Sequence, residues 1–208
     1  MAIVVFGVGQ LILPGLAAQS VRARLSGNGR VLNVSVSAFP AVELLFGDAD
    51  RVTVSMASYR GGESELASRI QQSSGVSELT VHVAQVRSGL LTLDAVTVTK
   101  HGAELQGSGT LTEANLRAAI PFLQSVSALG DADGGVVLRG RAQVPFLGDI
   151  SADALVTPRS GRLVVSGVGL LGSFLHLTVF ASPHLHVESI TGRPVVGGLF
   201  LSARARQS

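Results

Sequence analysis

The glycines at positions 167 to 172 form the motif in this chain that most resembles a cofactor site. Gly167, Gly169 and Gly172 have the G-x-G-x-x-G spacing that holds a dinucleotide pyrophosphate. That fingerprint needs a helix directly after the glycines, because the helix N-terminus binds the phosphates. The segment from Ser173 to Phe180 instead has the pattern of a strand. The motif therefore indicates a glycine-rich turn, and no cofactor is expected.

Two other groups contain residue types that bind metal ions. His184 and His186 would place two imidazoles on one strand face, with Glu188 as the only further ligand nearby. Asp131 and Asp133 begin like a calcium loop, but the later ligands of that loop are missing. A solvated strand face explains the histidines better than a metal site does, and a turn explains the aspartates. No metal is expected.

Catalytic groups cannot be picked out by spacing. The sequence has no G-x-S-x-G nucleophile elbow and no phosphate-binding P-loop. It has no cysteine, which excludes disulfides, zinc–thiolate sites and thiol catalysis. Its serines occupy alternating polar positions along expected strands. We therefore expect a protein that is not an enzyme.

The composition indicates one folded, apolar domain. Hydrophobic residues make up 46% of the 208 residues, and charged residues make up only 14%, against a usual share of about 25%. Aromatic residues are 4% of the chain and the net charge is +2, so the dense basic and stacking surface of a nucleic-acid-binding protein is missing. Nucleic acid is therefore excluded as a partner. Arginines near both ends are compatible with weak attraction to anionic lipid headgroups.

The first 14 residues form a segment of their own. Ala2 to Val8 and Leu11 to Leu13 are apolar, and Pro14 ends the run. The run is shorter than the roughly 20 residues that span a bilayer, and it lacks the basic start of a signal peptide. It is either a buried first segment or the end of an export signal or membrane anchor that begins upstream, and we favour the second. The division expected is an apolar segment over 1–14 and a single domain over 15–208.

Helical patterns are few and short. Apolar residues at helical spacing predict a helix over about 11–25, and shorter helices are expected over 40–46 and 63–72. A longer helix is expected over 112–126, with Thr112 as its N-terminal cap.

Strand patterns fill the rest of the chain. Apolar residues alternate with polar ones in runs that include Leu32–Val36, Val52–Met56, Leu79–Val83, Ala103–Leu111, Val136–Val144, Leu163–Val165, Leu175–Val179, Leu185–Val187 and Leu199–Leu201. Turn residues at 100–102, 131–135 and 158–161 join consecutive strands, which predicts an antiparallel meander. Leu93 and Val96 have opposite parity, so a bulge or bend is expected near Ala95.

The expected fold class is mainly β with a few short helices (α+β). Closing the meander into an elongated β-barrel would remove its two exposed edges. Gly107, Gly109 and Gly140 fall on the apolar parity, where glycine permits curvature and leaves space inside the barrel. Because large rings are also scarce, we expect the apolar face to be curved and incompletely filled.

A set of short motifs connects the chain to a known family. They are Leu11-Ile12-Leu13-Pro14, Ala17-Ala18-Gln19, Val21-Arg22, Val34-Ser35-Val36, Phe39-Pro40, Leu44-Leu45-Phe46-Gly47, Asp50-Arg51-Val52 and Leu111-Thr112-Glu113-Ala114-Asn115-Leu116. In this order they resemble the LmeA-like phospholipid-binding proteins of the actinobacterial cell envelope. The likeness runs over nearly the whole chain and involves no catalytic residue.

The resemblance implies a barrel that encloses a tunnel for acyl chains. It also implies export to the cell envelope or periplasm, with a phospholipid or other acyl lipid and a membrane surface as partners, and we expect a monomer. On the expected parity, the tunnel lining is predicted to be Val34, Val36, Val52, Val54, Leu79, Val81, Leu105, Leu138 and Val165. A helical plug or mouth is predicted from Phe39, Leu44, Phe46, Leu116 and Ile120. Two other hypotheses are an envelope assembly protein with a filled core and an enzyme of envelope glycolipid metabolism.

Overall fold

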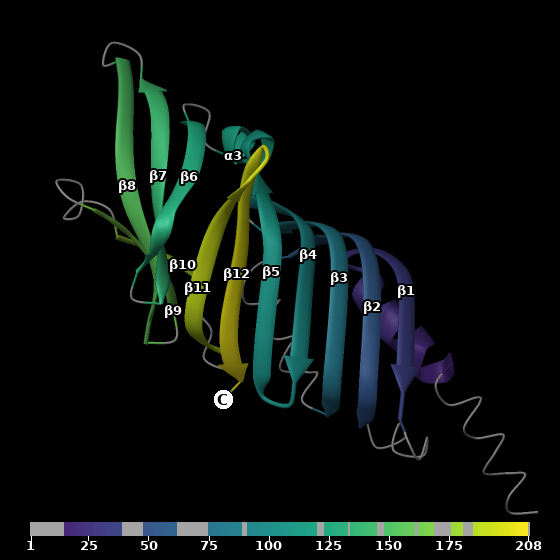
Figure 1. The fold of residues 1–208 in the computed structure, drawn as a ribbon. Coiled ribbons are helices and arrows are strands. Elements are labelled where there is room, and N and C mark those ends of the chain that lie inside the picture. Colours follow the sequence, from purple (N-terminus) through teal and green to yellow (C-terminus); the bar gives the residue numbers. More distant parts are fainter. Residues whose placement is uncertain are drawn as a thin grey trace, which may run out of the picture.

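The computed structural model describes residues 15–38, 48–61, 75–88, 91–119, 123–132, 134–144, 148–160, 162–168, 176–180 and 185–207. This part of the chain is mainly β, as predicted, and its strands form two sheets (Figure 1). The large sheet has the order β1 (Gly29–Ser37), β2 (Ala49–Arg60), β3 (Val76–Ser88), β4 (Leu91–His101), β5 (Glu104–Thr112), β12 (Gly198–Gln207) and β11 (Leu185–Val195). The small sheet has the order β10 (His176–Phe180), β9 (Arg162–Gly167), β8 (Gly148–Arg159), β7 (Gly135–Val144) and β6 (Leu123–Ala132).

The predicted closed barrel is not confirmed, because neither sheet closes within the described residues. The large sheet ends at β1 and β11, and the small sheet ends at β10 and β6. The predicted single meander is also wrong, because the strands divide between two sheets. β2 and β3 are parallel, and β12 lies between β5 and β11. Alternation along one strand specifies its two faces but not its neighbours, which is why the sequence did not reveal this topology.

Two helices are described. The N-terminal helix (residues 15–26) agrees with the helix predicted over 11–25. In α3 (Glu113–Ala119), the backbone N–H of Asn115 donates to Oγ1 of Thr112 at 3.3 Å, which confirms the predicted cap. The helix predicted over 112–126 is too long, since residues 123–132 form β6 and pair with β7. The short helices predicted over 40–46 and 63–72 lie outside the described residues.

The predicted hairpin turns are confirmed where they are described. Gly102 between β4 and β5, Gly134 between β6 and β7, and Ser160 between β8 and β9 have φ values of 57°, 71° and 51°. Positive φ is the backbone conformation that tight turns between antiparallel strands require.

The bulge predicted near Ala95 is confirmed and extends over three strands. Ala95 has a φ of 51°, and the pairing of β4 with β5 shifts by one residue between Asp94 and Thr97. On β2 the buried residues Met56 and Tyr59 are three positions apart, as are Val83 and Val86 on β3. Ala57, Ala84 and Ala95 lie side by side on β2, β3 and β4, at the positions where the alternation of buried and exposed residues shifts by one. We call this line of three residues the phase break. Bulges bend strands, and β2, β3 and β4 curve over at the same end of the sheet (Figure 1).

Candidate functional site

One face of the large sheet, here called the inner face, carries a continuous row of apolar residues. The pairing register aligns one residue from each strand across the sheet. In strand order this middle row is Val34, Val54, Val81, Val98, Gly107, Ala203 and Ile190. Every member is aliphatic or glycine, so the row forms an apolar path across all seven strands.

A second row, the lower row, runs beside it and contains one cation. In strand order it is Val36, Val52, Leu79, Lys100, Leu105, Ala205 and Val187. Lys100 is only 2% exposed, and its Nζ donates to the backbone oxygen of Val76 at 2.6 Å. Burial away from water lowers the pKa of this amine below its ordinary value, because desolvation disfavours the charged form. The apolar path is therefore bordered by a buried amine on this side.

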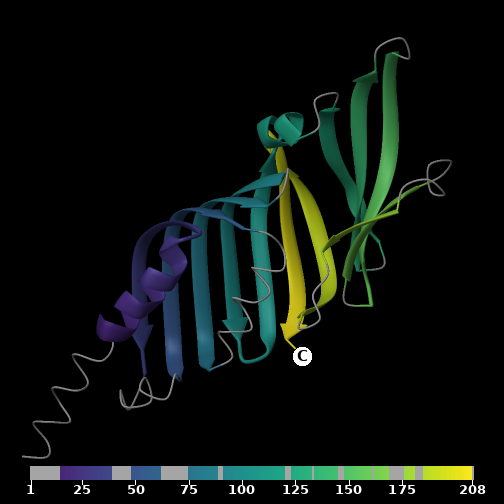
Figure 2. The same cartoon turned by 180° about the vertical axis from the view of Figure 1, so that it is seen from behind.

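Different elements cover the two sides of the inner face. Ala17, Val21 and Leu25 of the N-terminal helix pack on a cluster formed by β1, β2 and β3. The small sheet packs on β11 through Val136 and Val156, which contact Ile190. Figure 2 shows the helix and the small sheet on opposite sides of this face, with β4, β5 and β12 between them.

A strip in the middle of this face is only half-buried. It consists of Val98, Gly107 and Ala203, which are register partners on β4, β5 and β12. A Cβ placed on Gly107 would meet no heavy atom within 4 Å, so this glycine leaves open space as predicted. Gly109 and Gly140 do not, since a Cβ there would lie 3.1 Å from Val96 and 3.3 Å from Leu123, respectively. We call Val98, Gly107 and Ala203 the central strip.

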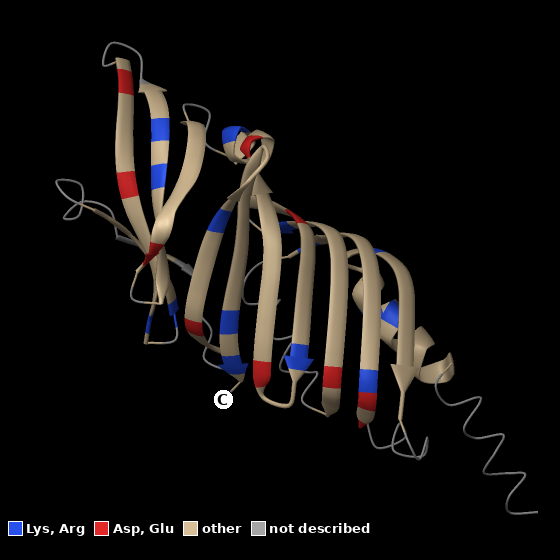
Figure 3. Ribbon diagram, in the orientation of Figure 1, with Lys and Arg blue, Asp and Glu red and all other residues tan. Residues whose placement is uncertain are grey.

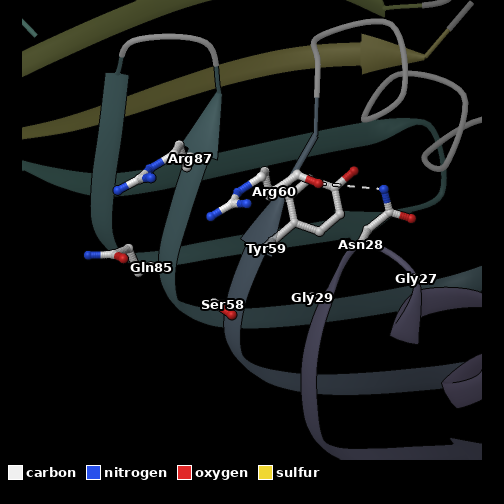
Figure 4. A pocket seen from close by; sticks show the side chains of 8 residues that line it. All are labelled: Gly27, Asn28, Gly29, Ser58, Tyr59, Arg60, Gln85 and Arg87. Atoms are coloured by element: carbon white, nitrogen blue, oxygen red, sulfur yellow. Dashed lines mark hydrogen bonds between the residues drawn. The ribbon is translucent and has the colours of Figure 1, made fainter.

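A polar pocket of about 350 Å³ lies where β2 and β3 end. Its lining residues are Gly27, Asn28, Gly29, Ser58, Tyr59, Arg60, Gln85 and Arg87. Arg60 and Arg87 are register partners, and Figure 4 shows both side chains extending to the same side of the strands. Tyr59 is 5% exposed and belongs to the apolar cluster of the inner face. Through Tyr59 the pocket adjoins the apolar interior, and we call its rim with Arg60 and Arg87 the arginine end.

The opposite rim also carries charges, and several of these form salt bridges. Nη2 of Arg51 lies 2.6 Å from a carboxylate oxygen of Glu78. Arg206 lies 3.8 Å from Glu104 and 3.4 Å from Glu188. Figure 3 shows acidic and basic positions next to one another along these strand ends. We call this rim the paired end.

A family model described as LmeA-like phospholipid-binding matches residues 7–183. The chain belongs to this family. The resemblance seen in the sequence motifs is thereby confirmed, and the LmeA-like family is one of lipid binders rather than a family of known enzymes. No curated protein and no solved structure matches the chain.

The structure brings most of the predicted lipid-lining residues of this LmeA-like protein together. Seven of them occupy the middle and lower rows: Val34, Val36, Val52, Val54, Leu79, Val81 and Leu105. Leu138 and Val165 are on the small sheet, where they pack against its buried cluster. Leu116 is 6% exposed on α3, which contacts β4, β5 and β6. The other predicted plug residues, Phe39, Leu44, Phe46 and Ile120, lie outside the described residues.

Sequence reasoning missed the arginine end and placed one residue on the wrong face. Leu32 was expected to share the inner face with Val34, but it is 55% exposed because β1 has a bulge between Val31 and Asn33. Arg60 and Arg87 were missed because they become neighbours only through the parallel pairing of β2 with β3. The available signal was the three-residue spacing of Met56 and Tyr59, repeated by Val83 and Val86.

The other sequence motifs add no site to the described part of this LmeA-like chain. Residues 176–180 form β10, which confirms the strand expected after the glycine motif. Among the described residues, no three His, Asp or Glu side chains gather as a metal site would require. Within the same residues, no helix combines the length and the apolar character that crossing a membrane takes.

Proposed function

We propose that this protein binds phospholipid without catalysis, with the acyl chains on the inner face, and carries it in the cell envelope. The observation that supports the proposal is the middle row, an apolar path over seven strands that has open space at Gly107. The family description, LmeA-like phospholipid-binding, supports the same ligand class.

The free energy of removing an acyl chain from water favours binding to the apolar inner face. Each CH₂ group kept from water contributes about 0.8 kcal/mol, so a long acyl chain costs on the order of 10 kcal/mol to expose. A carrier must therefore offer an apolar surface that is not already filled. The central strip offers such a surface, because its aliphatic residues and glycine are only half-buried.

The length of the inner face also suits an acyl chain. Val54 in the middle row is five residues from Tyr59 at the arginine end, which corresponds to roughly 16 Å along β2. One leaflet of a bilayer contributes about half of the hydrocarbon core, or about 15 Å. A chain whose polar group stays at the arginine end would therefore reach the middle row.

The arginine end also exposes apolar side chains that could touch a membrane surface. Leu91 at the start of β4 is 42% exposed, and Val196 between β11 and β12 is fully exposed. Both residues lie at the same end of the large sheet as Arg60 and Arg87. We propose that lipid enters and leaves at this end.

The proposal includes export to the envelope, supported by the apolar run before Pro14. Cell fractionation of the C-terminally tagged protein should place it in the envelope fraction. Recovery entirely in the cytoplasmic fraction would contradict export without affecting the lipid-binding part of the proposal.

Filling the open space at Gly107 tests the binding site. We expect Gly107→Phe to fold normally, because a Cβ there meets no atom within 4 Å and strands favour aromatic residues. It should lose most of the phospholipid that the unmodified protein takes up from vesicles, measured by organic extraction and mass spectrometry. Gln106→Phe is the matched control, since its exposed side chain points to the opposite face of β5.

Two outcomes would count against the proposal. Undiminished uptake by a folded Gly107→Phe variant would show that acyl chains do not use the central strip. Absence of lipid from the unmodified protein would favour an envelope assembly protein with a filled core.

A further inference from the structure

We infer that the pocket at the arginine end binds the phosphate of the lipid headgroup through the guanidinium groups of Arg60 and Arg87. The inference rests on the proposed function and adds to it the part of the lipid that this pocket recognises. It explains why two cations stand together at this rim without a salt bridge among the described residues.

The first support is the charge arrangement. Arg60 and Arg87 are direct register partners on parallel strands, which lie about 4.8 Å apart in a sheet. Like charges placed opposite each other on neighbouring strands are unfavourable. Within the described part of the chain, neither guanidinium forms a salt bridge, whereas Arg51, Arg117, Arg139 and Arg206 each have a carboxylate partner. An anion between Arg60 and Arg87 would relieve their repulsion.

The second support is the set of other polar groups. The planar guanidinium presents donors in a fork that matches phosphate oxygens, and Ser58 adds a hydroxyl group. The nearby carboxylate of Asp94 is already bound, since it accepts from Nε2 of Gln85 at 3.2 Å and from Nδ2 of Asn115 at 2.8 Å. Asp94 thus has hydrogen-bond partners of its own and forms no salt bridge with either arginine.

The third support is the phase break, which decides where these side chains point. If the alternation of Val54 and Met56 continued unbroken, Arg60 would point to the inner face and Tyr59 away from it. The extra residue at Ala57 reverses this, and Ala84 does the same on β3 for Val86 and Arg87. Tyr59 therefore lies on the inner face beside the pocket, while Arg60 and Arg87 point away from that face at its rim.

The test compares two lipids that differ only in the phosphate. Fluorescent phosphatidic acid and the diacylglycerol with the same acyl chains are titrated against the protein, and each dissociation constant is measured. We expect the unmodified protein to bind phosphatidic acid at least about 10-fold more tightly than diacylglycerol, and added salt to reduce this preference. The double variant Arg60→Gln/Arg87→Gln should bind both lipids with the affinity that the unmodified protein has for diacylglycerol.

The matched control is Arg159→Gln/Arg162→Gln. These two arginines are also exposed register partners, but they lie at the β8–β9 hairpin of the small sheet. The control should keep the preference for phosphatidic acid, and circular dichroism with urea unfolding would verify that both double variants fold.

Each remaining outcome has one meaning. If the folded Arg60→Gln/Arg87→Gln variant keeps the preference, the headgroup assignment is wrong while lipid binding stands. If the unmodified protein binds inorganic phosphate in calorimetry but shows no preference between the two lipids, the pocket is a site for free anions and the assignment is again wrong. If neither lipid binds, the proposed function itself fails.

Discussion

The basic side chains at the two ends of the large sheet differ in the partners they have. At the paired end, Arg51 and Arg206 have carboxylates within 2.6 to 3.8 Å, and the Lys100 amine is buried against a backbone oxygen. At the arginine end, Arg60 and Arg87 are neighbours, and neither forms a salt bridge in the described part of the chain. The difference fits the headgroup role proposed above for Arg60 and Arg87, whereas the charges of the paired end contact groups of the protein itself.

The largest expected effect concerns Tyr59, which anchors the arginine end by packing rather than by charge. Replacing this 5% exposed ring in Tyr59→Ala should lower the free energy of unfolding by about 3 kcal/mol, as aromatic truncations in a core do. Tyr59→Phe keeps the ring and is the matched control. Urea denaturation would measure both, and a loss below about 1 kcal/mol for Tyr59→Ala would mean that the ring does not hold this end together.

A smaller, pH-dependent effect is expected from Lys100 at the paired end. Because burial lowers its pKa in the fold, the unfolded chain binds more protons between that lowered pKa and the ordinary value of 10.5. The free energy of unfolding should therefore rise with pH through this window. Lys100→Met should abolish the rise, and Lys100→Arg, which cannot lose its charge, should abolish it at a lower stability.

Urea unfolding from neutral pH to pH 10.5 would follow this dependence. A rise of equal size in the unmodified protein and in Lys100→Met would assign it to another group.

The smallest expected effect is a change in stability on removing charge. Its sign should differ between the paired end and the arginine end, so it tests the comparison of the two ends most directly. Arg51→Gln removes an exposed ion pair and should lower stability by less than about 1 kcal/mol. Without lipid, Arg60→Gln/Arg87→Gln removes a repulsion and should raise stability by a similarly small amount. Thermal unfolding at low salt would compare the two, and destabilisation by both changes would remove the distinction between the ends.

The sequence predicted the family and the inner face because both depend on local patterns. Alternation alone was enough to place Val34, Val54 and Val81 in one row, and a parity conflict was enough to locate the bulge at Ala95. It failed at Leu32, because a one-residue bulge reverses the face of each residue beyond it.

The barrel and the pocket depend on non-local pairing. Nothing in the residues of β2 and β3 shows that these strands run parallel, yet this pairing sets Arg60 beside Arg87. The open topology was equally hidden, because the side of the inner face next to β11 is covered by Val136 of the small sheet rather than by closure. Individual side chains were thus predicted more reliably than the partners of each strand.

The position of β12 also governs the order in which the protein can be assembled. Residues 198–207 form the strand that joins β5 to β11, so the seven-stranded sheet stays in separate parts until these residues have been synthesised. Until then, β5 and β11 each present an unpaired edge, which is the feature that recruits other chains and leads to aggregation. The middle row crosses all seven strands, so it is complete only once β12 has paired with both neighbours.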